Sequence, residues 1–380
     1  MMFREPGNVA EFVRIPTVKT GRSDLLLIPL RPIRCLPALA FVWLVACASP
    51  AAGQTPDIRH GGAVPREVRE IYDRGLQYLA ASQGPNGDWP TTGQTGPGIT
   101  GLCLMAFLAS GEDPNFGLYS RNVHSAIRAL IAAQDATGMF GGPGHGNMYH
   151  HGFAMLALAE AYGAVDDRAL WADVDAEKRR SLGESLELAV RAAVTSQKRN
   201  PQGAWRYSPN AQDADTSVSG AVFMGLLAAR NAGIEVPDES IAQAIGFYQR
   251  MTAANGLVGY SGGMGGPGES TARSSIGTLV FAIARRKDLP QYKAALDHIK
   301  GQTGQQPQQW SEYTCYYQAQ ALFQGDQEAW ELWNKQQVRR LNAAQQSDGS
   351  IQSDFGPAYG TGMSLLVLAL NYRYLPIYER

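Results

Sequence analysis

The chain has 380 residues, of which 44% are hydrophobic and 18% charged, a composition typical of a globular protein with a sizeable core. The formal net charge is -1, so the chain lacks the basic field that attracts nucleic acid, and we expect no nucleic-acid partner. The 42 glycines gather between apolar stretches and follow no collagen-like period, which is typical of loops.

Residues 1–47 are typical of an export signal. An apolar run at 35–46 follows two arginines and is far shorter than the roughly 20 residues that span a bilayer. It ends in Leu-Val-Ala-Cys at 44–47, which resembles the lipobox of bacterial lipoproteins, where the signal is removed before a lipidated cysteine. Ordinary signal cleavage within the same segment is the alternative.

We therefore expect an exported protein of the periplasm or cell envelope, held to the membrane by a lipid on Cys47. Residues 48–64 are rich in Pro, Gly, Gln and Ala and are typical of a flexible linker. The folded domain is expected at 65–380.

Within 65–380 one pattern recurs six times: an amphipathic stretch at helical spacing, a short turn, and a nearly uncharged apolar stretch. The amphipathic stretches are 68–79, 126–133, 186–194, 241–251, 292–299 and 330–344, and the apolar ones are 99–109, 153–162, 218–229, 276–284, 313–323 and 363–370. A helix with one charged face meets water on that face, whereas an uncharged helix is buried. The alternation predicts an all-α protein built from stacked helical hairpins.

A closed ring fits this repeat better than an open solenoid. A solenoid normally ends in repeats with polar outer faces, but the last stretch here is as apolar as the middle ones. We predict an α/α toroid, an (α/α)6 barrel with the apolar helices inside. The turns contain Gly and, in most repeats, an aromatic residue, and we expect these aromatics to fill gaps between hairpins: Trp89, Phe140, Trp205 and Trp310.

The turns at 83–89 and 134–140, where a glutamine precedes Gly-x-aromatic, resemble the repeat of squalene cyclases and protein prenyltransferases. The chain is similar in particular to exported bacterial proteins with prenyltransferase/squalene-oxidase repeats, and the matching stretches are 148–152, 205–207, 213–217 and 330–334. The resemblance covers the whole of 65–380 and implies the toroid fold. It does not select a chemistry, because this architecture carries cyclases, prenyltransferases, thioester proteins and polysaccharide-acting enzymes.

In such a ring the inner helices run parallel, so their amino ends and the partial positive charge of those ends meet at one mouth. Polar residues at these helix starts are the candidates for contacting a small-molecule, isoprenoid or glycan ligand in the central cavity. They are Arg206, Tyr207, Asp213, Tyr260, Arg273, Tyr313, Tyr317 and Tyr359. Tyrosine offers both a stacking face and a hydroxyl, which suits a polar or sugar-like ligand.

The segment 213–217 contains the motif that points most specifically to a chemistry. It resembles the Asp-x-Asp-Asp segment with which class II terpene cyclases protonate an alkene, and the resemblance implies that Asp215 is the general acid. Thr216 stands where that family has its last aspartate. The alternative is structural, because an aspartate directly before an apolar helix is a common N-cap.

His151 is a second candidate for acid–base chemistry, since it lies near the start of an apolar helix. The alternative is a core histidine hydrogen-bonded to a neighbouring turn. Cys315, Asp213 and His151 are the residue types of a prenyltransferase zinc site, but the Asp-x-Cys spacing of that family is absent. We expect no metal and no cofactor.

Three functions remain open. The first is an exported binding protein with a ligand in its central cavity, the second a terpene-cyclase-like isomerase that uses Asp215. The third is a polysaccharide lyase or hydrolase that uses His151, Tyr207 and Arg206. The sequence leaves open whether the protein turns over a substrate.

Overall fold

The computed structural model describes residues 64–90, 96–141, 147–171, 180–262, 270–305 and 310–378. All of them belong to one compact unit, Ile58–Arg380. The expected signal at 1–47, its Cys47 and all but the last residue of the expected linker at 48–64 lie outside the described residues. In the described part, no helix has the length and apolarity that crossing a membrane requires.

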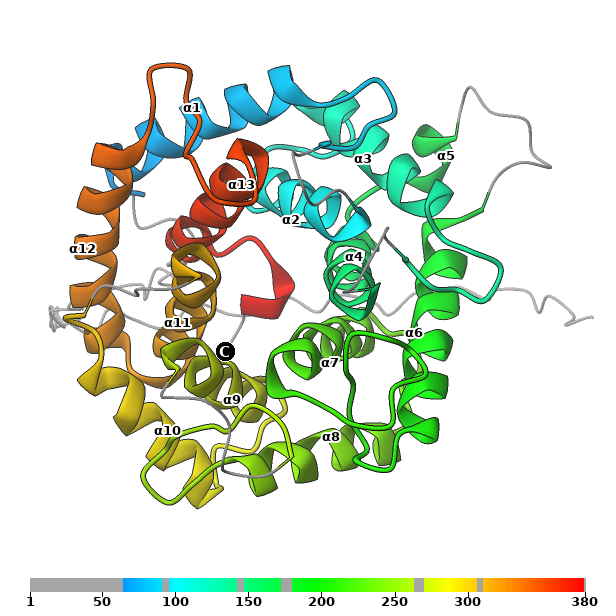
Figure 1. Cartoon of the computed structure of the whole chain (residues 1–380). Coiled ribbons are helices and arrows are strands. Elements are labelled where there is room, and N and C mark those ends of the chain that lie inside the picture. The colour runs from blue at the N-terminus through cyan, green and yellow to red at the C-terminus, as the bar shows by residue number, and fades with distance from the viewer. Residues whose placement is uncertain are drawn as a thin grey trace, which may run out of the picture. The chain divides into compact units, whose positions relative to one another are not determined.

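The described residues form two concentric layers of helices (Figure 1). The outer helices are α1 (Arg66–Ser82), α3 (Ser120–Ala132), α6 (Leu182–Arg199), α8 (Asp238–Met251), α10 (Pro290–Gly301) and α12 (Gln327–Ala344). The inner helices are α2 (Pro97–Leu108), α4 (Asn147–Ala161), α7 (Thr216–Asn231), α9 (Thr271–Ile283), α11 (Ser311–Gly325) and α13 (Pro357–Leu368). Each inner helix packs on the next, and α13 packs on α2, so the ring closes. The predicted α/α toroid is confirmed.

Burial follows the hydrophobic pattern of each layer. In α1 the buried side chains form one stripe that includes Val68, Ile71, Leu76 and Leu79, and the charged residues face solvent. In α2 every residue from position 97 to 107 is buried, because neighbours surround this helix on all sides. Burying one large apolar side chain contributes about 1.5–3 kcal/mol, so burial in both layers stabilises the ring.

A repeated glutamine joins neighbouring hairpins. In four repeats the glutamine Nε2 donates both to a glycine carbonyl of its own turn and to a carbonyl in the next outer helix. The pairs of acceptors are Gly87 and Asn122 for Gln83, Gly138 and Ser185 for Gln134, Gly203 and Ser240 for Gln197, and Gly349 and Ile71 for Gln345. The last pair connects the sixth hairpin to α1 and so helps to close the ring.

The turn aromatics fill gaps between hairpins in three of the four predicted positions. Trp89, Phe140 and Trp205 are at most 2% exposed, and the indole N–H of Trp205 donates to the carbonyl of Ala193 at 2.9 Å. Trp310 is the exception, because its side chain is 62% exposed. Its backbone is left-handed, with φ at 53°. The prediction that Trp310 fills a gap is wrong, and the turn before α11 presents it to solvent instead.

The end of the ring that carries the carboxyl ends of the inner helices is covered by the last residues of the chain. After α13 come two short 3-10 helices, η2 (Ala369–Asn371) and η3 (Pro376–Tyr378). Leu375 and Ile377 are buried, and the backbone N–H of Ile377 donates to the Glu160 carboxylate at 3.3 Å. Figure 1 shows this red segment within the outline of the ring. The candidate site residues lie at the opposite end of the ring, the mouth, where the inner helices begin.

Candidate functional site

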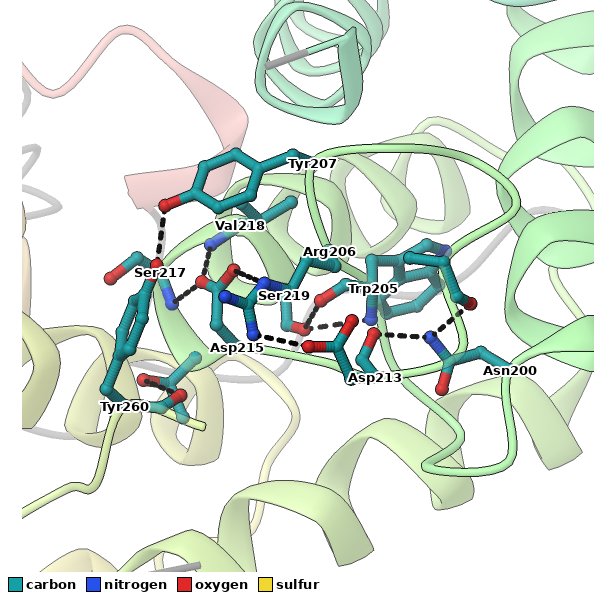
Figure 2. A network of polar contacts seen from close by, with 12 residues as sticks. Asn200, Trp205, Arg206, Tyr207, Asp213, Asp215, Ser217, Val218, Ser219 and Tyr260 are labelled. Atoms are coloured by element: carbon teal, nitrogen blue, oxygen red, sulfur yellow. Dashed lines mark hydrogen bonds and ion pairs between the residues drawn. The ribbon is translucent and has the colours of Figure 1, made fainter. Parts of the chain in front are cut away.

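Asp215 is the residue directly before α7, and its carboxylate caps that helix. One carboxylate oxygen, Oδ1, accepts the backbone N–H groups of Ser217 at 2.9 Å and Val218 at 2.8 Å (Figure 2). These N–H groups have no partner within the helix, so the cap satisfies them. The N-cap interpretation of Asp215 is confirmed.

The second carboxylate oxygen of Asp215, Oδ2, is buried and accepts no hydrogen bond from the described residues. The side chain is fully buried. The nearest cation is Arg206, whose Nε lies 3.7 Å from Oδ2. Burial raises the pKa of Asp215 to about 6, although the N–H group of Val218 and the charge of Arg206 act in the opposite direction. Asp215 therefore holds its proton to a higher pH than an exposed aspartate does.

Arg206 and two tyrosines form the rim beside this carboxyl. The Arg206 guanidinium makes a 2.7 Å ion pair with the exposed Asp213 and lies 5.5 Å from the ring centre of Tyr207 and 5.4 Å from that of Tyr260. The two tyrosine hydroxyls are 2.5 Å apart (Figure 2). Arg273 lies 5.8 Å from the ring centre of Tyr260. The structure therefore brings five of the predicted ligand-binding residues together next to Asp215.

Aromatic side chains from opposite inner helices meet in the middle of the ring. The ring centre of Tyr149 in α4 lies 6.3 Å from that of Tyr313 in α11, and Phe153 lies 6.4 Å from Tyr316 in the same two helices. Tyr317 is 1% exposed and packs 4.9 Å from Tyr313. These rings occupy the hollow at their level. The central cavity expected from the sequence is therefore filled by side chains at this level.

Tyr149 is a member of the site that the sequence analysis missed. Its ring lies 6.0 Å from Tyr207, and burial together with the nearby charge of Asp215 raises its pKa well above the usual value. The helical period contains the signal, because residues four apart share a helix face. Tyr149 and Phe153 therefore point to the centre, whereas His151, two residues along, points to the opposite side.

His151 packs between α4 and α6. Its Nδ1 accepts the backbone N–H of Phe140 at 3.2 Å, and its Nε2 lies 3.1 Å from the carbonyl oxygen of Ala189, to which it donates. Burial lowers the pKa of His151 to about 4, so the ring is neutral. The core-histidine interpretation is confirmed, because His151 is fully buried and both ring nitrogens are bonded to backbone groups. We assign it no catalytic role.

A second aromatic group lies at the mouth, between α11 and α13. The exposed ring of Trp310 stacks on Phe355 with 5.4 Å between ring centres and 17° between planes, and Phe355 packs at 5.1 Å against Tyr359. We call these three residues the Trp310 stack. Tyr359, predicted as a ligand contact, belongs to this stack. Trp310 was named from the sequence only as a residue that fills a gap, so its exposed ring as a possible binding surface was missed.

Three further features of the described residues lie apart from this group: a surface depression, the possible metal ligands and the two cysteines. A polar depression of about 480 Å³ lies outside the ring, lined by residues of α6, the following turn and α8, among them Lys198, Glu239 and Arg250. No group of three or more His, Cys, Asp or Glu side chains in the described ranges could share a metal ion. Cys103 and Cys315 are both free and buried.

No family model and no curated protein matches the chain. Several solved structures do. One is a variant of the type II terpene cyclase MstE from Scytonema with the substrate geranylgeranyl dihydroxybenzoate (TM-score 0.52, 14% identity, 81% of this chain and 98% of that chain). A D-mannose isomerase gives a TM-score of 0.57 at 10% identity, covering 82% of this chain and 98% of that chain.

A third similar structure is the unsaturated glucuronyl hydrolase of Bacillus sp. GL1, responsible for the degradation of glycosaminoglycan. It has a TM-score of 0.54 and 12% identity, and the match covers 81% of this chain and 97% of that chain. At these identities the likeness shows the fold alone. The chain is thus an α/α toroid with the architecture of a terpene cyclase, a sugar isomerase and a glucuronyl hydrolase.

Proposed function

We propose that the mouth of this toroid binds a small molecule and that Asp215 donates a proton to it. The observation that carries the proposal is the second oxygen of Asp215, which is buried without a hydrogen-bond partner in the described residues. An orphaned buried carboxyl oxygen costs stability, and it is expected where a ligand or a reaction uses it. The raised pKa, about 6, leaves Asp215 protonated in roughly half of the molecules at pH 6 and in roughly one in ten at pH 7.

The reaction that fits best is the protonation of an alkene in an isoprenoid-like ligand. The O–H bond of Asp215 breaks and a C–H bond forms at one alkene carbon, which leaves a carbocation on the ligand and a carboxylate on the protein. The rings of Tyr149, Tyr207 and Tyr260 provide faces that attract a cation. Loss of a proton from another ligand carbon to a water molecule completes an isomerisation of unchanged mass, and Asp215 regains its proton from solvent. Arg206 stabilises the transient carboxylate.

Geranylgeranyl dihydroxybenzoate, the substrate of the terpene cyclase with the same fold, is the first probe. The purified protein is incubated with it, and products are separated by chromatography with mass detection. We expect a product of equal mass and changed retention from the native protein. Asp215→Asn should remove that product, while Asp297→Asn, a change on the exposed face of α10, should not. The proposal fails if Asp215→Asn forms the product at the native rate, or if the native protein neither binds nor converts the probe.

A carbohydrate ligand is the second candidate, because of the Trp310 stack. One face of the Trp310 ring rests on Phe355 and the side chain is 62% exposed, an arrangement that suits stacking against a sugar ring. The two other similar folds act on sugars. Titration with D-mannose and with an unsaturated glucuronyl disaccharide, followed by isothermal titration calorimetry, tests this. Binding that disappears in Trp310→Ala would favour this candidate, and the absence of binding would remove it.

We also propose, on sequence alone, that the protein is exported and that Cys47 is lipidated. Intact-mass measurement of the protein extracted from its native membrane tests both. The expected species begins at Cys47 and carries the mass of a lipid. A chain that retains residues 1–46, or one that begins after Cys47 without lipid, contradicts this.

A further inference from the structure

The two most exposed of the large apolar side chains in the described residues lie together at the end of the ring away from the mouth. Phe116 is 86% exposed and Leu118 is 78% exposed, both in the loop that follows α2. Tyr162 and Tyr374, 40% and 59% exposed, follow α4 and α13 respectively. Because the inner helices run parallel, segments that follow them lie at the same end. Several large apolar side chains exposed at one end of the ring make that end a candidate contact surface.

The loop that carries Phe116 is held in place. The Asp113 carboxylate accepts the backbone N–H groups of Asn115 at 2.8 Å and Phe116 at 3.0 Å. The Asn115 side chain donates to the carbonyl of Ala164 at 2.9 Å and accepts the N–H of Asp166 at 2.8 Å. These bonds fasten the loop to the neighbouring connection after α4. The apolar side chains therefore point into solvent instead of folding back onto the core.

The polypeptide enters the ring at this same end. The Tyr72 hydroxyl of α1 donates to the carbonyl of Ala106 in the last turn of α2 at 2.8 Å, and its ring lies 4.7 Å from Tyr372. The first half of α1 is thus beside the carboxyl end of α2. The described chain begins at residue 64, and the sequence before it contains the apolar run at 35–46 and Cys47. A flexible linker of this length has a root-mean-square span of roughly 20–25 Å.

We propose that this end of the ring is the surface that faces a lipid bilayer, with Phe116 and Leu118 inserted into the membrane interface. Attachment near residue 47 would keep this surface within reach of the bilayer, so a weak apolar contact is enough. The mouth with Asp215 then opens toward water. Acidic Glu112 and Asp113 lie beside the apolar side chains, so the contact depends on apolar insertion more than on anionic lipid. The proposal does not depend on what the mouth binds.

Orientation on vesicles tests the proposal. The full chain is bound to phosphatidylcholine vesicles, and single reporter cysteines are treated with a water-soluble maleimide. The chain used is the one extracted from its native membrane, in which signal removal takes away Cys35 and the proposed lipid occupies the Cys47 thiol, while Cys103 and Cys315 are fully buried, so little background labelling is expected. Leu118→Cys reports on the proposed membrane surface, and Gln352→Cys, an exposed position in the turn before α13, reports on the mouth. We expect vesicles to slow labelling of Leu118→Cys about tenfold or more and to leave Gln352→Cys unchanged.

A second pair of variants asks whether the apolar side chains cause the protection. Phe116→Ser in the Leu118→Cys background should restore fast labelling, whereas Leu332→Ser, which changes a 60% exposed side chain on α12, should not. Three results would overturn the proposal. They are equal labelling of the two reporters on vesicles, failure of the full chain to bind vesicles, and protection of Leu118→Cys without lipid, which would indicate a protein partner instead.

Discussion

Nε of Arg206 lies 3.7 Å from the buried Oδ2 of Asp215, while another nitrogen of the same guanidinium lies 2.7 Å from the exposed Asp213. Arg206 therefore forms its shorter ion pair with the solvated Asp213, and the buried Oδ2 of Asp215 receives no hydrogen bond from it. Burial then outweighs the attraction of Arg206, and the pKa of Asp215 rises to about 6. This competition between two aspartates for one arginine makes Asp215 the distinctive group of the mouth.

Asp215→Asn should stabilise the protein near neutral pH. The folded protein holds the Asp215 proton more tightly than the unfolded chain, where the pKa is about 4. The resulting stability is complete below about pH 4 and is lost as the pH rises through about 6, a loss of the order of 2–3 kcal/mol. Asparagine keeps the cap acceptor without the charge. Urea unfolding at pH 4 and pH 7.5 should show a gain only at the higher pH, and an equal effect at both would contradict the assignment.

Asp213→Asn should lower the pKa of Asp215. The substitution removes a negative charge that raises that pKa and frees Arg206 to move toward Oδ2. Infrared spectroscopy of the carboxyl band, with Asp215→Asn to identify the signal, measures the titration. The midpoint should shift from about 6 toward more acidic pH. An unchanged midpoint would mean that Asp213 does not control the position of the arginine.

Tyr207→Phe and Tyr260→Phe should be coupled. Their hydroxyls are 2.5 Å apart, so either single change removes the same hydrogen bond, which contributes about 0.5–1.5 kcal/mol. The double variant should therefore cost less than the sum of the two singles. Unfolding free energies of the four proteins give the coupling energy. Strictly additive losses would show that the two hydroxyls do not interact in solution.

His151→Gln should weaken the protein at neutral pH and flatten its response to acid. Neutral His151 makes two buried hydrogen bonds, and their disruption should cost about 1–3 kcal/mol. Because the folded pKa is about 4, below the unfolded value of about 6.5, its stabilising contribution is present above pH 6.5 and is lost as the pH falls toward 4. Thermal unfolding from pH 7.5 to 4 measures this. His298→Gln on α10 should retain the native pH response.

The two tryptophan turns should respond very differently to substitution. Trp205→Ala removes a 1% exposed side chain and should cost about 3–5 kcal/mol. Trp310→Gly removes a 62% exposed side chain and relieves a left-handed backbone at φ 53°, so the net change should stay within about 1 kcal/mol. Calorimetric melting temperatures distinguish the two. A large loss in Trp310→Gly would show that this residue fills a gap after all.

The sequence by itself determined the layers of this protein and the cap at Asp215. Both follow from local rules. A charged stripe or an uncharged surface decides whether a helix meets water, and an aspartate reaches N–H groups only two and three residues ahead. The closed ring was also predictable, because an apolar final hairpin must cover its face. The bond from Gln345 to the carbonyl of Ile71 across the join is consistent with that reasoning.

Tertiary structure alone decided how the mouth is arranged. The contact of Tyr149 with Tyr313 depends on the rotation of α4 and α11 about their own axes. The same rotation turns His151 outward. Each rotation is set by many packing contacts between segments distant in the chain, and no local pattern contains them. Arg206 likewise lies about 1 Å closer to Asp213 than to Asp215, a difference that only the folded chain defines.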